Sequence, residues 1–185
     1  MTTPLHTTVF IATSLDGHIA RPDGALDWLP GADPDHPGED FGYAAFMASV
    51  DTVVMGRHTF ETALDFGDWP YPQHRVVVLS SRGVTIPGAL REQRIEVLSL
   101  PPTAVLAHLA EGGARRVYVD GGRTVQGFLR AGLIDELIIT RVPVLLGAGI
   151  PLFGELERDI PLQHLATRSF ANGLVQSHYR VVPAV

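Results

Sequence analysis

The sequence contains no cysteine. This absence excludes disulfides, thiolate metal sites and a cysteine nucleophile, and it leaves the redox compartment unconstrained. No apolar run approaches the ~18 residues that a membrane span needs. The first residues, Met1 to His6, contain no basic segment followed by a long apolar stretch, as a secretion signal would. We therefore expect no membrane association and a cytoplasmic location.

Clusters of basic residues are also lacking, and the net charge is −6. A protein that binds a phosphate backbone or an anionic membrane usually presents a basic patch, so we expect neither nucleic acid nor membrane as a partner. The eight histidines include no His-x-His or His-x-x-x-His pair. We therefore expect no metal site.

The chain has 185 residues, of which 45% are hydrophobic. This length and composition predict one domain over residues 1–185. Continuous runs rich in Val, Ile, Leu and Thr predict strands buried on both faces. These runs are Thr7–Thr13, Thr52–Met55, Arg75–Leu79, Ile95–Leu98, Arg116–Val119 and Glu136–Leu146.

In the segments between these runs, apolar residues recur every three or four positions, as in amphipathic helices. The expected helices are Asp40–Val50, Thr59–Leu64, Thr103–Glu111 and Thr124–Ala131. Further on, Asn172-Gly173 separates two strand-like runs, Leu162–Phe170 and Leu174–Val182, which is typical of a hairpin. The pattern predicts a three-layer α/β fold with a largely parallel sheet, helices on both faces and a C-terminal antiparallel hairpin.

Two predicted strands end in glycine turns that lead into helices. Met55-Gly56-Arg57-His58-Thr59 places an arginine at a helix start, where free amides and the helix dipole favour an anion. Asp120-Gly121-Gly122-Arg123-Thr124 is a second such turn. Each turn alone is equally an ordinary strand-to-helix connection. Two of them after parallel strands favour a bound dinucleotide.

A third strand ends at Leu79-Ser80-Ser81-Arg82, which is either a site for the adenosine 2′-phosphate or an ordinary polar loop. The common Gly-x-Gly-x-x-Gly fingerprint between the first strand and helix is absent, which disfavours a Rossmann dehydrogenase. Gly147-Ala148-Gly149 leads into Ile150-Pro151 rather than a helix. We interpret it as a strand-to-loop turn.

Two carboxylates are candidates for proton transfer. Asp16 follows the first strand, where Asp16-Gly17 is also a simple turn. Asp40 heads a predicted helix, where it is equally a cap; burial beside a ring ligand would raise its pKa and suit it to proton transfer. Trp28, in the long polar segment from Arg21 to Glu39, is either a wall for a planar ring or a core anchor.

These motifs, in this order and spacing, resemble the dihydrofolate reductase superfamily. Ser14-Leu15-Asp16-Gly17-His18-Ile19-Ala20 and Pro143–Phe153 resemble the riboflavin-biosynthesis reductase domain within it. The resemblance implies NADPH as cofactor and Asp40 as the acceptor-binding carboxylate. It implies nicotinamide contacts from Ala12 and Ile19, and further cofactor contacts from Gly56, Arg57, His58, Thr59, Leu79, Ser80, Ser81, Arg82, Gly121, Gly122, Arg123 and Thr124.

We therefore expect an NADPH-dependent reductase that transfers hydride to a pteridine- or ribosylaminopyrimidine-like heterocycle. Dihydrofolate reductase activity proper, a non-catalytic nucleotide-binding protein, and a reductase that handles flavin or deazaflavin are the alternatives. The long final strands leave a sheet edge that a second subunit could cover, which predicts a homodimer.

Overall fold

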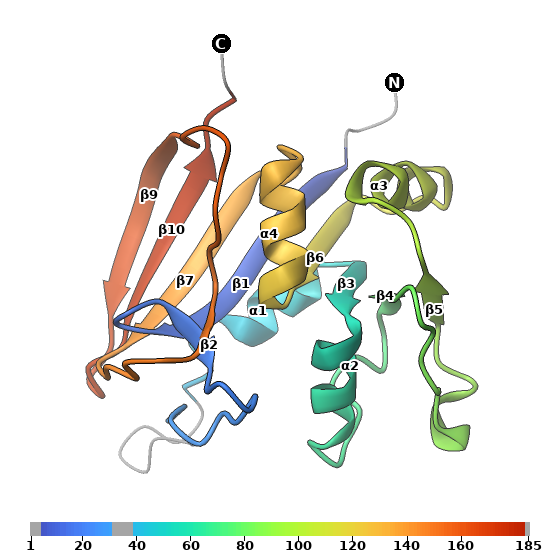
Figure 1. Cartoon of the computed structure of the whole chain (residues 1–185), viewed down its shortest axis with the longest axis horizontal. Helices are drawn as coiled ribbons and strands as arrows, with labels where there is room; N and C mark the ends of the chain where they lie inside the picture. The colour runs from blue at the N-terminus through green and yellow to red at the C-terminus, as the bar shows by residue number, and fades with distance from the viewer. Residues whose placement is uncertain (1–4, 31–38, 184–185) are drawn as a thin grey trace.

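The computed structural model of the protein describes residues 5–30 and 39–183. Its main feature is an eight-stranded sheet in the order β5-β4-β3-β6-β1-β7-β10-β9 (Figure 1). The strands are β1 (His6–Ser14), β3 (Thr52–Gly56), β4 (Arg75–Leu79), β5 (Ile95–Leu98), β6 (Arg116–Asp120), β7 (Glu136–Val142), β9 (Leu162–Ser169) and β10 (Val175–Val181). In this order, all pairs from β5 to β7 are parallel, and β10 pairs antiparallel with both β7 and β9.

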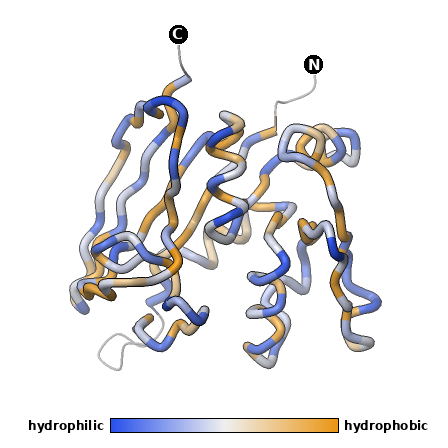
Figure 2. The backbone as a smooth tube through the Cα atoms, in the orientation of Figure 1, coloured by the Kyte–Doolittle hydropathy of each residue, from blue (hydrophilic) through white to orange (hydrophobic). Residues whose placement is uncertain are grey.

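The central strands are apolar on both faces because helices cover both sides. Val76, Val77 and Val78 are successive residues of β4, and all three are fully buried. Figure 2 shows the hydrophobic stretches along the central strands, whereas β9 and β10 are of mixed polarity. Continuous apolar runs of this kind therefore predict a parallel sheet inside a layered fold.

The helices form the two outer layers. Met47 from α1 (Tyr43–Ser49) and Phe60 from α2 (Arg57–Leu64) belong to the hydrophobic cluster on one face of the sheet. Helices α3 (Pro102–Glu111) and α4 (Gly122–Arg130) contribute to the cluster on the other face. A single 3-10 turn, η1 (Gly88–Leu90), precedes β5. The predicted three-layer α/β fold is confirmed.

The C-terminal hairpin is also confirmed. The Phe170 amide donates to the Leu174 carbonyl across the turn, at 2.9 Å. Gly173 has a φ of +85°, a conformation that glycine adopts without steric cost. The sheet therefore finishes with an antiparallel edge.

One strand is shorter than predicted. The run Glu136–Leu146 was expected to be extended throughout, but β7 ends at Val142. Pro143 has no backbone N–H to donate to a neighbouring strand. The residues after it form hydrogen bonds with Leu15 and Asp16 instead. Two short strands that the sequence did not indicate, β2 (His18–Ala20) and β8 (Ile150–Pro151), pair there in a separate sheet.

The predicted loop from Arg21 to Glu39 is described only in part, because positions 31–38 lie outside the described residues. In the part of the chain that the structure covers, no helix has both the length and the apolar character needed to cross a bilayer.

Candidate active site

The three predicted cofactor turns follow three neighbouring strands. Gly56 at the end of β3 pairs with Leu79 at the end of β4, and Met55 pairs with Asp120 at the end of β6. Because these strands are parallel, their carboxyl ends meet at one edge of the sheet. The structure thus brings together the segments 56–59, 79–82 and 120–124.

The starts of α2 and α4 pack against each other through glycines. A Cβ atom at Gly121 would collide with the Thr59 hydroxyl, and one at Gly56 would lie 3.0 Å from the Thr124 hydroxyl oxygen. Neither helix has a side-chain cap at its N-terminus. First-turn amides have no acceptor within their own helix, so two uncapped N-termini side by side suit an anion such as a pyrophosphate.

The charged side chains at these turns lie toward solvent. The Arg57 guanidinium donates to Glu61 Oε1 at 3.1 Å, one helical turn away on α2. His58 is 77% exposed in its side chain, and Arg123 is exposed. These groups are accessible to a ligand at the sheet edge, and Arg57 is held near the helix start by an exposed ion pair.

Beside these turns, the ends of β4 and β5 border an open surface depression of about 320 Å³. Its polar lining comes from Ser80, Ser81 and Ser99, and its apolar lining comes from Leu79, Leu98 and Leu100. Arg82 is exposed next to it, and its amide donates to Ser80 Oγ at 3.3 Å. The predicted adenosine subsite therefore coincides with a surface depression.

The residues predicted to flank the nicotinamide lie on the other side of the glycine turns. Ala12 is in β1, paired with Thr140 of β7. The Ile19 Cδ1 atom lies 3.0 Å from the Cβ position of Gly122, so Ile19 rests directly on the second turn. Trp28 is partly buried, and its indole nitrogen is shielded from solvent with no acceptor among the described residues.

Asp120 is a further functional candidate, which the apolar spacing and glycine motifs alone do not indicate. Its Oδ1 accepts the Gly121 amide at 2.8 Å, and the described part of the chain contains no cation within ion-pair distance of it. Burial raises the pKa of Asp120 to about 6. One sequence feature could have identified Asp120: it directly follows an apolar strand and precedes paired glycines. That position lies at the edge of the sheet where the carboxyl ends of the strands meet.

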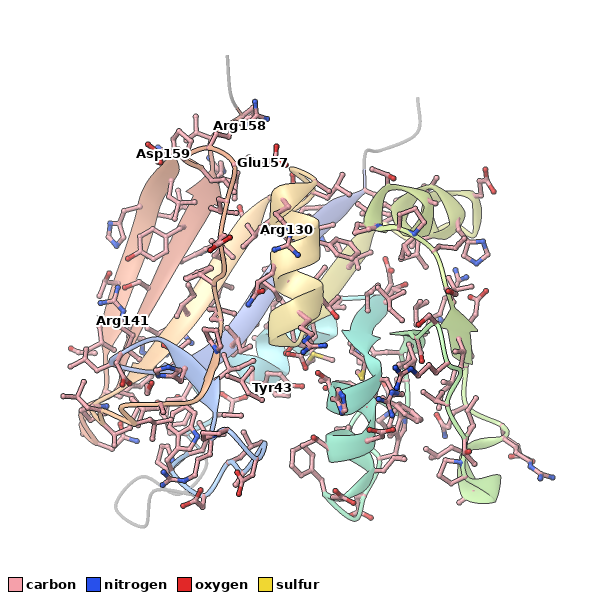
Figure 3. The ribbon with its side chains drawn as sticks, viewed as in Figure 1. Tyr43, Arg130, Arg141, Glu157, Arg158 and Asp159 are labelled. Atoms are coloured by element: carbon pink, nitrogen blue, oxygen red, sulfur yellow. The ribbon has the colours of Figure 1, made fainter. Side chains whose placement is uncertain are left out.

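Aromatic side chains surround this carboxyl. The Tyr118 hydroxyl donates to the Phe10 carbonyl at 2.9 Å, and the Phe10 and Tyr43 rings lie 5.6 Å apart. Burial and the nearby Asp120 raise the pKa of both Tyr43 and Tyr71. In Figure 3 Tyr43 lies near the start of α4. The described side chains whose pKa burial and the Asp120 carboxylate together raise are therefore the tyrosines Tyr43, Tyr71 and Tyr118.

The two aspartates predicted to be catalytic have backbone partners instead. Both oxygens of Asp40 accept amides just downstream, from Gly42 at 2.9 Å and Ala44 at 2.7 Å. These bonds lower its pKa, and the side chain is exposed, whereas a catalytic role was expected to come with burial and a raised pKa. Asp16 accepts hydrogen bonds from Ser14 and from the amides of residues 146 and 147, which lower its pKa strongly. The geometry of both favours a structural role.

Comparisons with known sequences agree with this architecture. The RibD C-terminal domain family matches residues 6–176. The uncharacterized protein YwjB of Bacillus subtilis (strain 168) is 36% identical over 176 residues, which cover 94% of this chain and 96% of that protein. The riboflavin biosynthesis protein RibD of Corynebacterium ammoniagenes is 30% identical over 156 residues, which are 78% of this chain but 45% of that protein.

Solved structures give the same result. A putative riboflavin biosynthesis protein from Shewanella sp. PV-4 superposes with a TM-score of 0.89 at 40% identity, over 97% of this chain and 100% of that one. The deaminase and 5-amino-6-(5-phosphoribosylamino)uracil reductase of Thermotoga maritima shares the fold, with a TM-score of 0.76 at 17% identity, over 96% of this chain and 57% of that one. With its dihydrofolate reductase-like fold and its match over residues 6–176, the chain belongs to the RibD C-terminal domain family.

Proposed function

We propose that the protein is an NADPH-dependent reductase that transfers hydride to a planar heterocycle of the pteridine or ribosylaminopyrimidine class. The observation that carries this proposal is the reciprocal packing of Thr59 on Gly121 and Thr124 on Gly56. It places two uncapped helix N-termini side by side at the carboxyl edge of the sheet, which suits a dinucleotide pyrophosphate.

Different residues at this edge contact different parts of the cofactor. Arg57 and Arg123 flank the two helix starts and neutralise phosphate charge, and His58, exposed beside Arg57, offers a ring nitrogen for a hydrogen bond to phosphate. Ser80, Ser81 and Arg82 line or border the depression at β4 and β5, and they hold the adenosine end with its 2′-phosphate. Ala12 and Ile19 border the nicotinamide. When bound, NADPH supplies the hydride, and the protein aligns donor and acceptor and excludes water.

Asp120 is the group best placed to handle a proton. Its Oδ1 is occupied by the Gly121 amide, so Oδ2 is the oxygen that carries the proton. With a pKa raised to about 6 by burial, the carboxyl is partly protonated near neutral pH, which suits a general acid. Tyr43 and Tyr71 lie near it; Tyr71 is buried, and the partly exposed Tyr43 ring suits contact with a planar heterocycle.

The first experiment titrates NADPH and NADH against the purified protein by fluorescence, with wild type beside Arg57→Ala. NADPH absorbance is then followed with dihydrofolate and with a ribosylaminopyrimidine as acceptors. Tight NADPH binding, weakened by Arg57→Ala, together with oxidation by one acceptor supports the proposal. Failure of both nucleotides to bind refutes it. Binding of NADPH with no turnover by either acceptor favours a non-catalytic nucleotide-binding protein.

Dihydrofolate reductase activity is the second candidate function. The dihydrofolate reductase HdrB of Haloferax volcanii is 30% identical over 129 residues, which cover 68% of this chain and 62% of that protein. The same absorbance assay separates the two candidates, because each acceptor is supplied alone. Oxidation by dihydrofolate but not by the ribosylaminopyrimidine selects this second function.

We also propose that the protein forms a homodimer through its final strands. Strand β9 is at the end of the sheet order, and every residue of it except Leu165 is exposed. An unpaired edge of eight residues is a surface that a second copy can cover. Light scattering tests this: a mass near 40 kDa, twice the chain's 20.0 kDa, supports the dimer, and 20.0 kDa refutes it.

A further inference from the structure

The carboxylate of Asp16 joins two loops that are far apart in the sequence. Its Oδ1 accepts from Ser14 Oγ at 2.6 Å and from the Leu146 amide at 3.1 Å, and its Oδ2 accepts from the Gly147 amide at 2.7 Å. Ser14 Oγ in turn accepts from the His18 amide at 2.9 Å. One side chain therefore ties the turn after β1 to the segment after β7.

These two segments form a flap, which we define as residues 14–20 and 143–152. The Leu15 amide donates to the Val144 carbonyl at 2.8 Å, and the Leu152 amide donates to the Gly17 carbonyl at 3.0 Å. Gly149 lies so close to the Ala20 carbonyl that no side chain fits there. The two segments thus close on each other along their length, with Asp16 at one end.

The flap rests on the second glycine turn. A Cβ atom at Gly122 would lie 3.0 Å from both Ile19 Cδ1 and the Pro151 carbonyl oxygen. Gln126 of α4 fixes the same contact, because its side-chain amide donates to the Pro151 carbonyl at 3.1 Å and to the Leu152 carbonyl at 3.3 Å. The position of the flap therefore determines how much space remains above residues 121 and 122.

We propose that Asp16 is a positioning residue, whose hydrogen bonds hold the β2–β8 flap over the Gly121–Gly122 turn and so pre-form the cofactor site. The inference rests on the proposed function, since it names what the flap covers. It assigns Asp16 no proton transfer. Its three hydrogen bonds stabilise the ionised carboxylate and lower its pKa, which suits a fixed structural anion.

Asp16→Asn tests the proposal, because asparagine keeps the size but loses the charge and one acceptor oxygen. Asp51→Asn is a matched control. Asp51 also accepts three hydrogen bonds, from Thr52 Oγ1 and from the amides of Arg115 and Arg116, each at 2.8 Å. It precedes β3 at the amino end of the strands, away from the glycine turns.

We expect Asp16→Asn to weaken NADPH binding by at least about tenfold in a fluorescence titration, and Asp51→Asn to leave it unchanged. Gly149→Ala, whose added methyl collides with the Ala20 carbonyl and the His18 side chain and so forces β8 away from β2, should reproduce the loss. Where turnover is measurable, its pH profile should stay unchanged in Asp16→Asn. Wild-type NADPH affinity in Asp16→Asn, or a shifted pH profile, overturns the positioning role.

Amide hydrogen exchange separates this inference from the proposed function. The amides of Leu146 and Gly147 should exchange faster in Asp16→Asn than in wild type or Asp51→Asn, whether or not a nucleotide binds. Failure of the wild type to bind either nucleotide refutes the proposed function alone. Unchanged exchange at these amides refutes the role of Asp16 in holding the flap.

Discussion

The Thr59 hydroxyl occupies the space in which a Cβ atom at Gly121 would lie. Gly121 also has a φ of +89°, so two independent constraints require glycine there. The contact holds the start of α2 against the start of α4. This carboxyl edge of the sheet is therefore built by close packing as well as by the free amides of the two helices.

Gly121→Ala should destabilise the protein by more than about 3 kcal/mol, because backbone strain and a steric collision add. Gly173→Ala is the control, since its φ is similar, at +85°, but its nearest neighbour is 3.4 Å away. That variant should cost only about 1–2 kcal/mol. Urea unfolding of both variants checks the difference, and equal losses would show that the Thr59 contact contributes nothing.

Asp120→Asn should stabilise the protein at neutral pH. The folded-state pKa of about 6 lies above the usual 3.8, so between these values the folded state binds more protons than the unfolded state, and stability falls as pH rises. Above pH 6 the buried charge costs at most about 3 kcal/mol. Asparagine avoids this cost.

The measurement is urea unfolding of wild type and Asp120→Asn at pH 4 and pH 7.5. The stability advantage of the variant should be greater at pH 7.5. An advantage that does not change with pH would show that the Asp120 carboxyl titrates normally. Under the proposed function, the same variant should also lose turnover, which would make this residue a case of stability given up for activity.

Arg82→Ala should reduce the affinity for NADPH by about tenfold and leave the affinity for NADH unchanged. Arg82 is exposed beside the depression lined by Ser80 and Ser81, and only NADPH has a 2′-phosphate for it to bind. Parallel fluorescence titrations with both nucleotides measure the ratio. Equal losses for both nucleotides would place Arg82 away from the 2′-phosphate. Arg91→Ala, on the exposed segment after η1, serves as the control for net charge.

Asp40→Asn and Asp40→Ala separate a capping role from a catalytic one. The two oxygens of Asp40 accept the amides of Gly42 and Ala44 at the entry to α1. Alanine removes both hydrogen bonds, whereas asparagine keeps one acceptor oxygen. Asp40→Asn should therefore keep turnover and most of the stability, whereas Asp40→Ala should lose about 1 kcal/mol of stability. Loss of turnover in Asp40→Asn would restore the catalytic assignment.

The sequence by itself determined the elements and their order. Every predicted strand and helix exists with ends within a few residues, except that the run from Glu136 stops at Val142 rather than Leu146. The layered α/β class, the final hairpin and the three turns at one sheet edge follow from local apolar spacing, glycine and Asn-Gly. Such signals are local in the chain, so a single sequence contains them.

Only the tertiary structure decided what each aspartate does. Asp16, Asp40 and Asp120 all follow or precede predicted elements. Asp40 bonds to amides two and four residues downstream, but no local signal distinguishes Asp16 from Asp120. Their different pKa directions arise from burial of Asp120 and from amides that bond Asp16 and Asp40. For Asp16 those amides are some 130 positions away in the chain. Because a pKa depends on neighbours that folding brings together, tertiary packing determined the environments of Asp16 and Asp120, which composition and spacing left open.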